Sequence, residues 1–296
     1  MLSHGFMWHA LVAAVLAGVV APTIGVHLVQ RRMSVVGDGI GHVALAGVAL
    51  GVVTGAAPVG TAVVVAVAGA VAVELLRGVR RTEVDTLLAI LSVGGVAGGV
   101  VLLSAVPAGR TADLDAYLFG SVLTTTRGEL VVLAGAAAAV LMVTVGLHRA
   151  LFAVSLDEEC ACAAGLPVRW LGLLLAATTA ATVVASMRVL GLLLVSALMV
   201  LPAAAATLLA RSCRGTLALA VVIGGLCAVA GTTAAYTAGL PAGGAIVLLC
   251  VAVFTAATVV PGARRCACRV LGTRAGHRPA RPAEVPALRS RVGLLP

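Results

Sequence analysis

Long apolar runs separated by short polar loops make up most of the chain. A helix that spans a bilayer needs about 20 predominantly apolar residues, and the runs reach this length. They show none of the period-two alternation that marks the strands of a membrane barrel. The pattern predicts an all-α integral membrane protein, a polytopic bundle of nine transmembrane helices. The predicted helices cover residues 8–29, 35–56, 58–76, 85–106, 129–147, 169–187, 189–210, 216–236 and 243–260.

The sixth and seventh predicted helices are separated only by a weak interruption at Ser186, Met187 and Arg188, so a bundle of eight spans remains an alternative. After the last predicted helix the composition changes. Residues 263–296 are rich in Arg and Pro and poor in large apolar side chains, which is typical of a disordered segment. We therefore expect a transmembrane domain over residues 1–262 and a disordered basic cytoplasmic tail over residues 263–296.

Composition and charge place the chain in a membrane. Hydrophobic residues make up 61% of it and charged residues 10%, well below the roughly 25% of soluble domains. The net charge of +9 does not indicate nucleic-acid binding, because all 20 basic residues are Arg and most lie at the ends of apolar runs. With nine spans, 17 of them fall on one side and only Arg110, Arg127 and Arg188 on the other. This positive-inside distribution predicts an external N-terminus and a cytoplasmic C-terminus.

The absence of lysine from the sequence excludes two kinds of chemistry. A phosphate-binding P-loop requires a Lys, and so does catalysis through a Schiff base. The H-E-x-x-H and G-x-S-x-G motifs do not occur either. We predict that the chain is not an enzyme, and that any ATP hydrolysis would need a separate subunit.

The seven cysteines do not suggest a disulfide framework. Cys227 and Cys250 lie within predicted spans, where a thiol behaves as a small hydrophobe. Two C-x-C pairs, at 160/162 and 266/268, are a weak metal-binding signal compared with paired C-x-x-C units. The simpler interpretation is that they are small residues in a loop and a tail.

Asp38 and His42 form the candidate functional pair. They lie four residues apart in an apolar run, so a helix places them on one face. Ionisable residues are costly inside a membrane and usually serve function. Counted from Arg32, the pair lies about 9 and 15 Å along the second predicted helix. Carboxylate oxygen and imidazole nitrogen suit Zn²⁺ or Mn²⁺.

The pair also has an interpretation that involves no metal. Asp38 is a residue type that often caps a helix N-terminus, and His42 would then be an interior histidine. Two ligands are too few for a closed tetrahedral site. A symmetric dimer would bring two Asp38 and two His42 side chains together and supply four.

Six segments resemble one protein family in the family's own order. Residues 31–38, Arg-Arg-Met-Ser-Val-Val-Gly-Asp, resemble the R-R-M-S-x-x-G-D run in permease subunits of bacterial ABC importers for zinc and manganese. His42 lies at the position of that family's next histidine, although Gly39 and Gly41 depart from its usual pattern. The other similar segments are residues 47–51, 85–90, 114–120 (an external re-entrant element in the family), 189–204 and 240–244.

The resemblance implies a type II ABC importer permease, similar to that of the vitamin B12 importer. It implies a homodimer in the bacterial cell membrane that works with a cytoplasmic ATP-binding subunit and an extracellular metal-binding protein. No permanently bound cofactor is expected, because Zn²⁺ or Mn²⁺ would be cargo. Asp38 and His42 accept both ions, and we lean towards zinc.

The polar segment between the fifth and sixth predicted helices is the second candidate site. Ser155 and Glu158 have the spacing of a capping box, and a short helix is expected over residues 160–164, ended by Gly165. The segment resembles the coupling helix by which ABC permeases bind their ATPase. The ATPase-coupling residues would be Asp157, Glu158, Glu159 and Gly165. The alternative is a solvated acidic loop.

The other polar and small residues in the apolar runs do not indicate a further functional site. We expect His27 to approach the headgroups, and Glu74 to pair with Arg77 at the surface. Gly94-Gly95 and Gly98-Gly99 have the spacing of a helix-packing face.

An ion-coupled secondary transporter or channel remains the alternative function. Internal inverted repeats would favour it, and none is obvious.

Overall fold

The computed structural model of the chain is helical wherever an element is assigned in the described residues, which are 5–79, 84–104, 117, 120, 126–210, 212–239 and 241–274. The helices are α1 (Gly5–Gln30), α2 (Val36–Thr54), α3 (Pro58–Val79), α4 (Val84–Ser104), α6 (Arg127–Gly146), α7 (His148–Leu156), α8 (Glu158–Ala163), α9 (Val168–Leu190), α10 (Leu192–Leu209), α11 (Cys213–Ala238) and α12 (Ala242–Arg274). The predicted all-α fold is confirmed.

Each predicted span corresponds to one long helix of the structure. Within the described residues, eight helices are long and apolar enough to cross a membrane. The remaining long helix, α4, has a shorter apolar stretch at Thr86–Leu102. The chain is therefore a multi-pass membrane protein, and the short α7 and α8 are additional elements in the polar segment between α6 and α9.

The sixth and seventh predicted helices are separate, but the break lies at Gly191, slightly beyond the predicted interruption at 186–188. Gly191 has φ 84° and ψ 152°, a backbone conformation that side chains disfavour. Gly120, with φ 70°, lies against this break, and a Cβ atom on it would be 2.2 Å from the carbonyl carbon of Leu190. Two glycines distant in sequence thus allow one close backbone contact.

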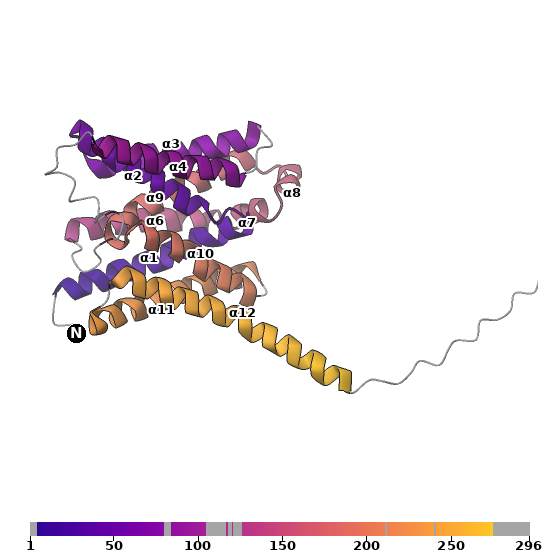
Figure 1. Ribbon diagram of the computed structural model, residues 1–296. Coiled ribbons are helices and arrows are strands. Elements are labelled where there is room, and N and C mark those ends of the chain that lie inside the picture. The colour runs from indigo at the N-terminus through magenta and orange to yellow at the C-terminus, as the bar shows by residue number, and fades with distance from the viewer. Residues whose placement is uncertain are drawn as a thin grey trace, which may run out of the picture. The chain divides into compact units, whose positions relative to one another are not determined.

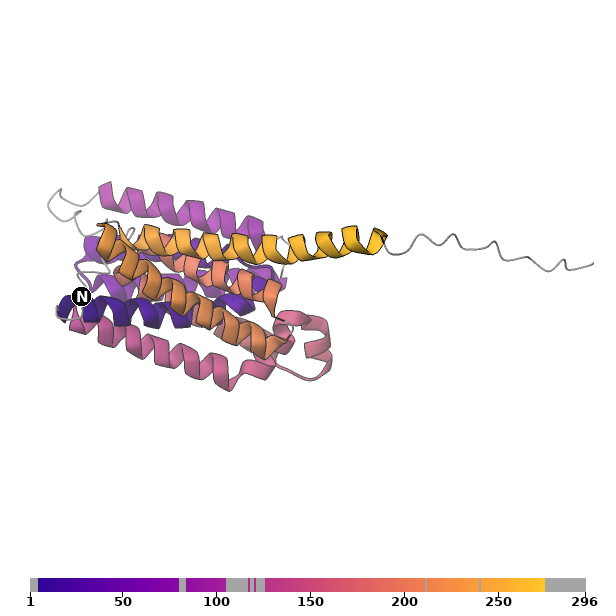
Figure 2. The ribbon, with the colours of Figure 1, turned by 90° about the horizontal axis from the view of Figure 1, so that it is seen from below.

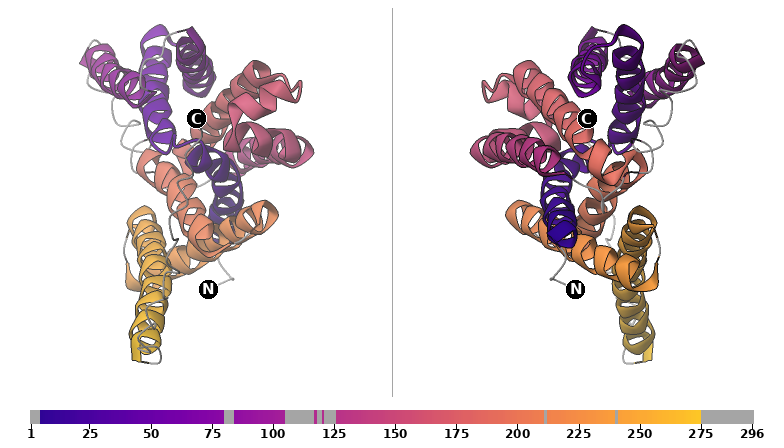
Figure 3. Two further views of the ribbon diagram at one scale, coloured as in Figure 1. Left: turned by 90° about the vertical axis from the view of Figure 1, so that its right-hand side faces the viewer. Right: turned by 90° about the vertical axis from the view of Figure 1, so that its left-hand side faces the viewer.

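Within residues Met1–Thr258, α1 is the most enclosed of the spanning helices. It packs against α10 and α11, while α2 packs against α3 and α4. Figure 1 shows α2, α3 and α4 on one side of α1 and α10, with α11 on the other. Figure 2 shows the same helices running side by side, and Figure 3 views them nearly end-on. The α1–α2 turn and α8 lie at the same end of this unit, which we call the α8 end.

The enclosed position of α1 depends on glycine. A Cβ atom on Gly25 would lie 1.7 Å from the carbonyl oxygen of Met199 in α10. One on Gly18 would lie 2.8 Å from the carbonyl oxygen of Gly224 in α11. In membranes, where lipid is as apolar as the helices, such small residues allow the close packing that holds helices together.

A second compact unit, Val259–Pro296, begins inside α12. The predicted tail was expected to be disordered from residue 263, but α12 continues as helix to Arg274. Residues 275–296, which make up the rest of the predicted tail, lie outside the described residues.

Candidate functional site

Asp38 and His42 lie one turn apart near the start of α2. Asp38 Oδ2 and His42 Nε2 are 3.5 Å apart, and the side chains are 41% and 22% exposed. Val35 occupies the N-cap position of α2, and no side-chain cap bond is formed there in the described structure. The capping alternative for Asp38 is therefore wrong, and the helix runs without interruption through Gly39 and Gly41.

The pair belongs to a single exposed stripe on an otherwise buried helix. Along α2, Ala46, Leu50 and Val53 follow Asp38 and His42 at intervals of three or four residues, and all are partly or fully exposed. Most of the other α2 side chains are buried. The pair thus points away from the packed interior of this chain. No third His, Cys, Asp or Glu completes a metal-binding group with it among the described residues.

Helix α4 approaches the pair closely because it presents glycine to α2. A Cβ atom on Gly95 would be 2.8 Å from the carbonyl carbon of His42 and 2.8 Å from the backbone nitrogen of Val43. A Cβ atom on Gly99 would be in ordinary contact with Ala46, at 3.6 Å. Gly94 and Gly98, the other members of the two glycine pairs, would place a Cβ atom in open space. The predicted packing face is thus formed by one glycine of each pair.

Replacing Gly95 by Ala is expected to destabilise the protein by about 1–3 kcal/mol, since the added methyl group meets backbone and forces α2 and α4 apart. If Asp38 and His42 bind metal as the sequence predicts, the displacement of His42 should also lower metal affinity in the same variant. Gly94→Ala is the matched control and should keep wild-type stability and affinity. Denaturant unfolding in detergent and metal titration measure both. Equal behaviour of the two variants would contradict the close contact of α4 with His42.

The predicted coupling segment folds as two short helices. Ser155 is buried in α7, so the predicted capping box with Glu158 is wrong. Asp157 caps α8 instead, and its Oδ1 accepts hydrogen bonds from the backbone N–H groups of Glu159 and Cys160, each at 3.0 Å. The expected stop is present, since α8 ends at Ala163 and Gly165 has φ 79°.

The acidic residues of α8 are not equivalent. Asp157 and Glu159 are exposed, whereas Glu158 turns back towards its own chain and binds Arg31 and Arg77. The hydrogen bond from the Cys160 N–H, followed by that from Glu159, holds the pKa of the Asp157 carboxyl below its ordinary value. Hydrogen bonding to the same carboxylate raises the pKa of the Cys160 thiol.

Two expectations about polar residues in the apolar runs are wrong. His27 does not approach the headgroups. It is fully buried under α7, with Nδ1 3.4 Å from Ser155 Oγ and its ring edge-on to Phe152. Glu74 does pair with Arg77, at 3.5 Å, but its side chain is only 13% exposed, so this is not a surface pair. His27 is buried because α7 covers the end of α1, and Glu74 is buried because α3 packs against α9, where Gly172 lies beneath it.

Sequence reasoning missed the part that Arg31 plays at this end of the bundle. Its guanidinium binds Glu158, which lies 127 positions away in the sequence. The sequence offered only two local patterns, an Arg at the end of a predicted span and an acidic residue three positions before Arg77. Neither pattern identifies a partner so distant. Of the predicted re-entrant element at 114–120, only Tyr117 and Gly120 are described, and Arg188 lies over the Tyr117 ring at 5.8 Å.

Comparison with known proteins identifies the fold and the family. The sequence model of the ABC 3 transport family matches residues 3–261. The chain is 32% identical over 257 residues to the manganese transport system membrane protein MntC of Halalkalibacterium halodurans, covering 87% of this chain and 88% of that protein. It is 33% identical to a probable metal transport system membrane protein of Treponema pallidum, covering 86% and 94%.

Two solved structures have the same fold. PsaBC from Streptococcus pneumoniae, solved in complex with a Fab, superposes with a TM-score of 0.77 at 30% identity, covering 86% of this chain and 92% of that one. An inward-facing putative metal-chelate type ABC transporter superposes with a TM-score of 0.70 at 16% identity, covering 85% of each chain. The fold is that of a type II ABC importer permease. The chain belongs to the ABC 3 transport family and is a metal-transporting ABC permease.

Proposed function

We propose that this permease imports a divalent metal cation into the cytoplasm, and that the ion passes Asp38 and His42. The observation that carries the proposal is the pair itself, a carboxylate and an imidazole 3.5 Å apart on the exposed stripe of a membrane-spanning helix. An intramembrane acid without a cation nearby is costly, so such a residue usually marks an ion pathway.

A second copy of the chain completes the site in this proposal. Each chain offers one oxygen and one nitrogen ligand, and both side chains are partly exposed. Two copies facing each other across a twofold axis would provide the four ligands that zinc prefers. Manganese accepts the same ligand types with additional water. The sequence favoured zinc slightly, but several relatives are named for manganese, so we propose manganese as the primary cargo.

The energy for transport would come from a cytoplasmic ATP-binding subunit, and the metal from an extracellular binding protein. The α8 end would face the cytoplasm, together with most of the arginines and the C-terminus. Asp157, Glu159 and Gly165 are exposed at this end, and we propose that they contact the ATPase. Glu158 is occupied within its own chain and would contribute indirectly.

Reconstitution into liposomes tests this function. The purified chain alone should neither hydrolyse ATP nor accumulate metal, because its sequence lacks a P-loop. Adding the ATPase and the metal-loaded binding protein should start ATP-dependent uptake of Mn²⁺, measured by elemental analysis of the vesicles. A parallel assay with Zn²⁺ compares the two ions. ATP hydrolysis by the pure chain, or uptake driven by a proton gradient without the ATPase, would contradict the proposal and favour the secondary-transporter alternative.

A further inference from the structure

Four charged side chains from three parts of the chain meet at the α8 end. Glu158 Oε1 accepts a hydrogen bond from Arg31 at 2.7 Å and another from Arg77. Glu74 Oε1 lies 3.5 Å from Arg77 Nη1 and 3.8 Å from Arg31 Nη1. Two positive and two negative charges therefore share one site, which we call the Arg31 network.

The Arg31 network is largely buried, unlike most ion pairs on protein surfaces. The side chains of Arg31 and Glu74 are 4% and 13% exposed, and only Glu158 is as much as 38% exposed. Glu74 lies directly over Gly172 of α9, where a Cβ atom would be 2.1 Å from its Oε1. Isolated surface pairs contribute little, but buried charges require their partners. The position of Glu158 is therefore tied to that of Arg31.

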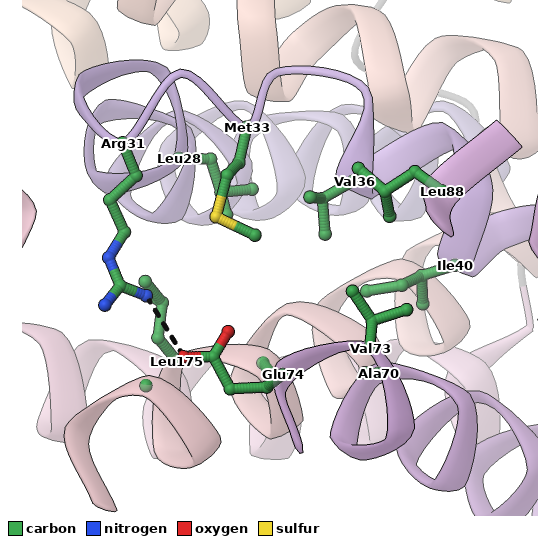
Figure 4. A pocket seen from close by; sticks show the side chains of 12 residues that line it. Leu28, Arg31, Met33, Val36, Ile40, Ala70, Val73, Glu74, Leu88 and Leu175 are labelled. Carbon is green, nitrogen blue, oxygen red and sulfur yellow. Dashed lines mark ion pairs between the residues drawn. The ribbon is translucent and has the colours of Figure 1, made fainter. Parts of the chain in front are cut away.

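A small cavity connects the network to α2. Arg31, Met33 and Glu74 line a cavity of about 20 Å³, and Ile40 of α2 lies at its other end (Figure 4). Arg31 Nε is buried and has no hydrogen-bond partner among the described residues. A cavity of this size holds about one water molecule, which would satisfy that nitrogen.

The network lies immediately before the metal pair in the chain. Arg31 follows the end of α1, and α2 begins at Val36, with Asp38 in its first turn. The intervening turn is held by a hydrogen bond from the Met33 N–H to the Leu28 carbonyl, at 2.9 Å. Arg32 has φ 58°, and it is the one non-glycine residue with positive φ in the described chain. A shift of Arg31 would therefore reach the start of α2 through a short, constrained turn.

We propose that Arg31, Glu74, Arg77 and Glu158 couple α8 to α2, so that movement of α8 on its ATPase repositions Asp38 and His42. Glu158 is the residue that moves, because it alone comes from α8. When Glu158 withdraws, Glu74 remains as the acidic partner of Arg31 and Arg77. These four are positioning residues, since none of them touches the ion. The inference rests on the proposed function, because it requires an ATPase bound at α8.

The test uses the complete transport complex in liposomes and compares metal moved with ATP hydrolysed. Arg77→Gln should leave basal ATP hydrolysis unchanged and lower the metal transported per ATP about tenfold, within the usual range of coupling between sites. Metal binding at equilibrium should stay at the wild-type level. Arg77→Lys should keep most of the coupling, because a lysine retains the positive charge that faces Glu74 and Glu158.

Glu129→Gln is the matched control. It removes another ion pair, Arg188 Nε to Glu129 Oε1 at 2.6 Å, while Gln can still serve the capping box of α6. Normal transport per ATP in Arg77→Gln would overturn the proposal. A loss in Arg77→Lys as large as that in Arg77→Gln would also overturn it, since the charged contact with Glu158 would then not carry the coupling. A wild-type complex that hydrolyses ATP but moves no metal would instead contradict the proposed function.

Discussion

Asp38→Asn should reduce metal uptake by the assembled transporter about 100-fold or more. Loss of even an outer partner of a metal ligand costs roughly 10–100-fold in affinity, and here a proposed ligand itself is changed. Asn keeps the size of the side chain and removes only the charge, so insertion into the membrane should be unaffected. His42→Gln should have a similar effect. Uptake of ⁵⁴Mn²⁺ by the assembled transporter and equilibrium metal binding by the purified permease measure transport and affinity separately.

The double variant distinguishes a shared ion site from two independent roles. If both residues bind one ion, Asp38→Asn with His42→Gln should lose little more than either single variant, because residues that act as a unit are not additive. Glu129→Gln, which changes an acid near the opposite end of the bundle, should transport normally. Wild-type uptake by either single variant would show that the pair does not bind the transported ion.

Gly25→Ala should prevent most of the protein from folding. Its methyl group would lie 1.7 Å from the Met199 carbonyl oxygen. The atoms it meets belong to the Met199 backbone, which cannot rotate away as a side chain could. Overpacking a well-packed interior typically costs about 1–3 kcal/mol and more where nothing can yield. Because α1 is the most enclosed spanning helix, moving it disturbs α10 and α11 as well. The yield of monodisperse protein after detergent extraction, and its melting temperature, measure the effect.

Gly135→Ala in α6 is the control for that experiment. Gly135 is exposed, and a Cβ atom there meets nothing within 4 Å. Ala is favoured over Gly in a helix interior by about 0.5–1 kcal/mol, so this variant should fold as well as wild type or slightly better. A normal yield of Gly25→Ala would show that α1 and α10 are less closely packed than the structure has them.

Features that depend on near neighbours in sequence were predictable. The apolar runs gave the long helices, and the four-residue spacing gave the contact of Asp38 with His42, because both lie on one helix. Features that depend on distant chain segments were not. The burial of His27 requires α7 to cover it, and the position of Glu158 requires Arg31 and Arg77. Ser155 was misassigned as a cap because neighbouring Leu151, Phe152 and Val154 are buried and extend α7 through it.

The contact between Gly120 and the Leu190–Gly191 break has a consequence for how this family member can vary. Both glycines have positive φ, and they meet at one place, where the backbones are too close for a side chain. A substitution at either position would force the two segments apart. A second substitution at the other position would then cost less stability than it costs alone, since contacting residues do not contribute independently. The two positions are therefore expected to change together during evolution or not at all, although about 70 residues separate them in the chain.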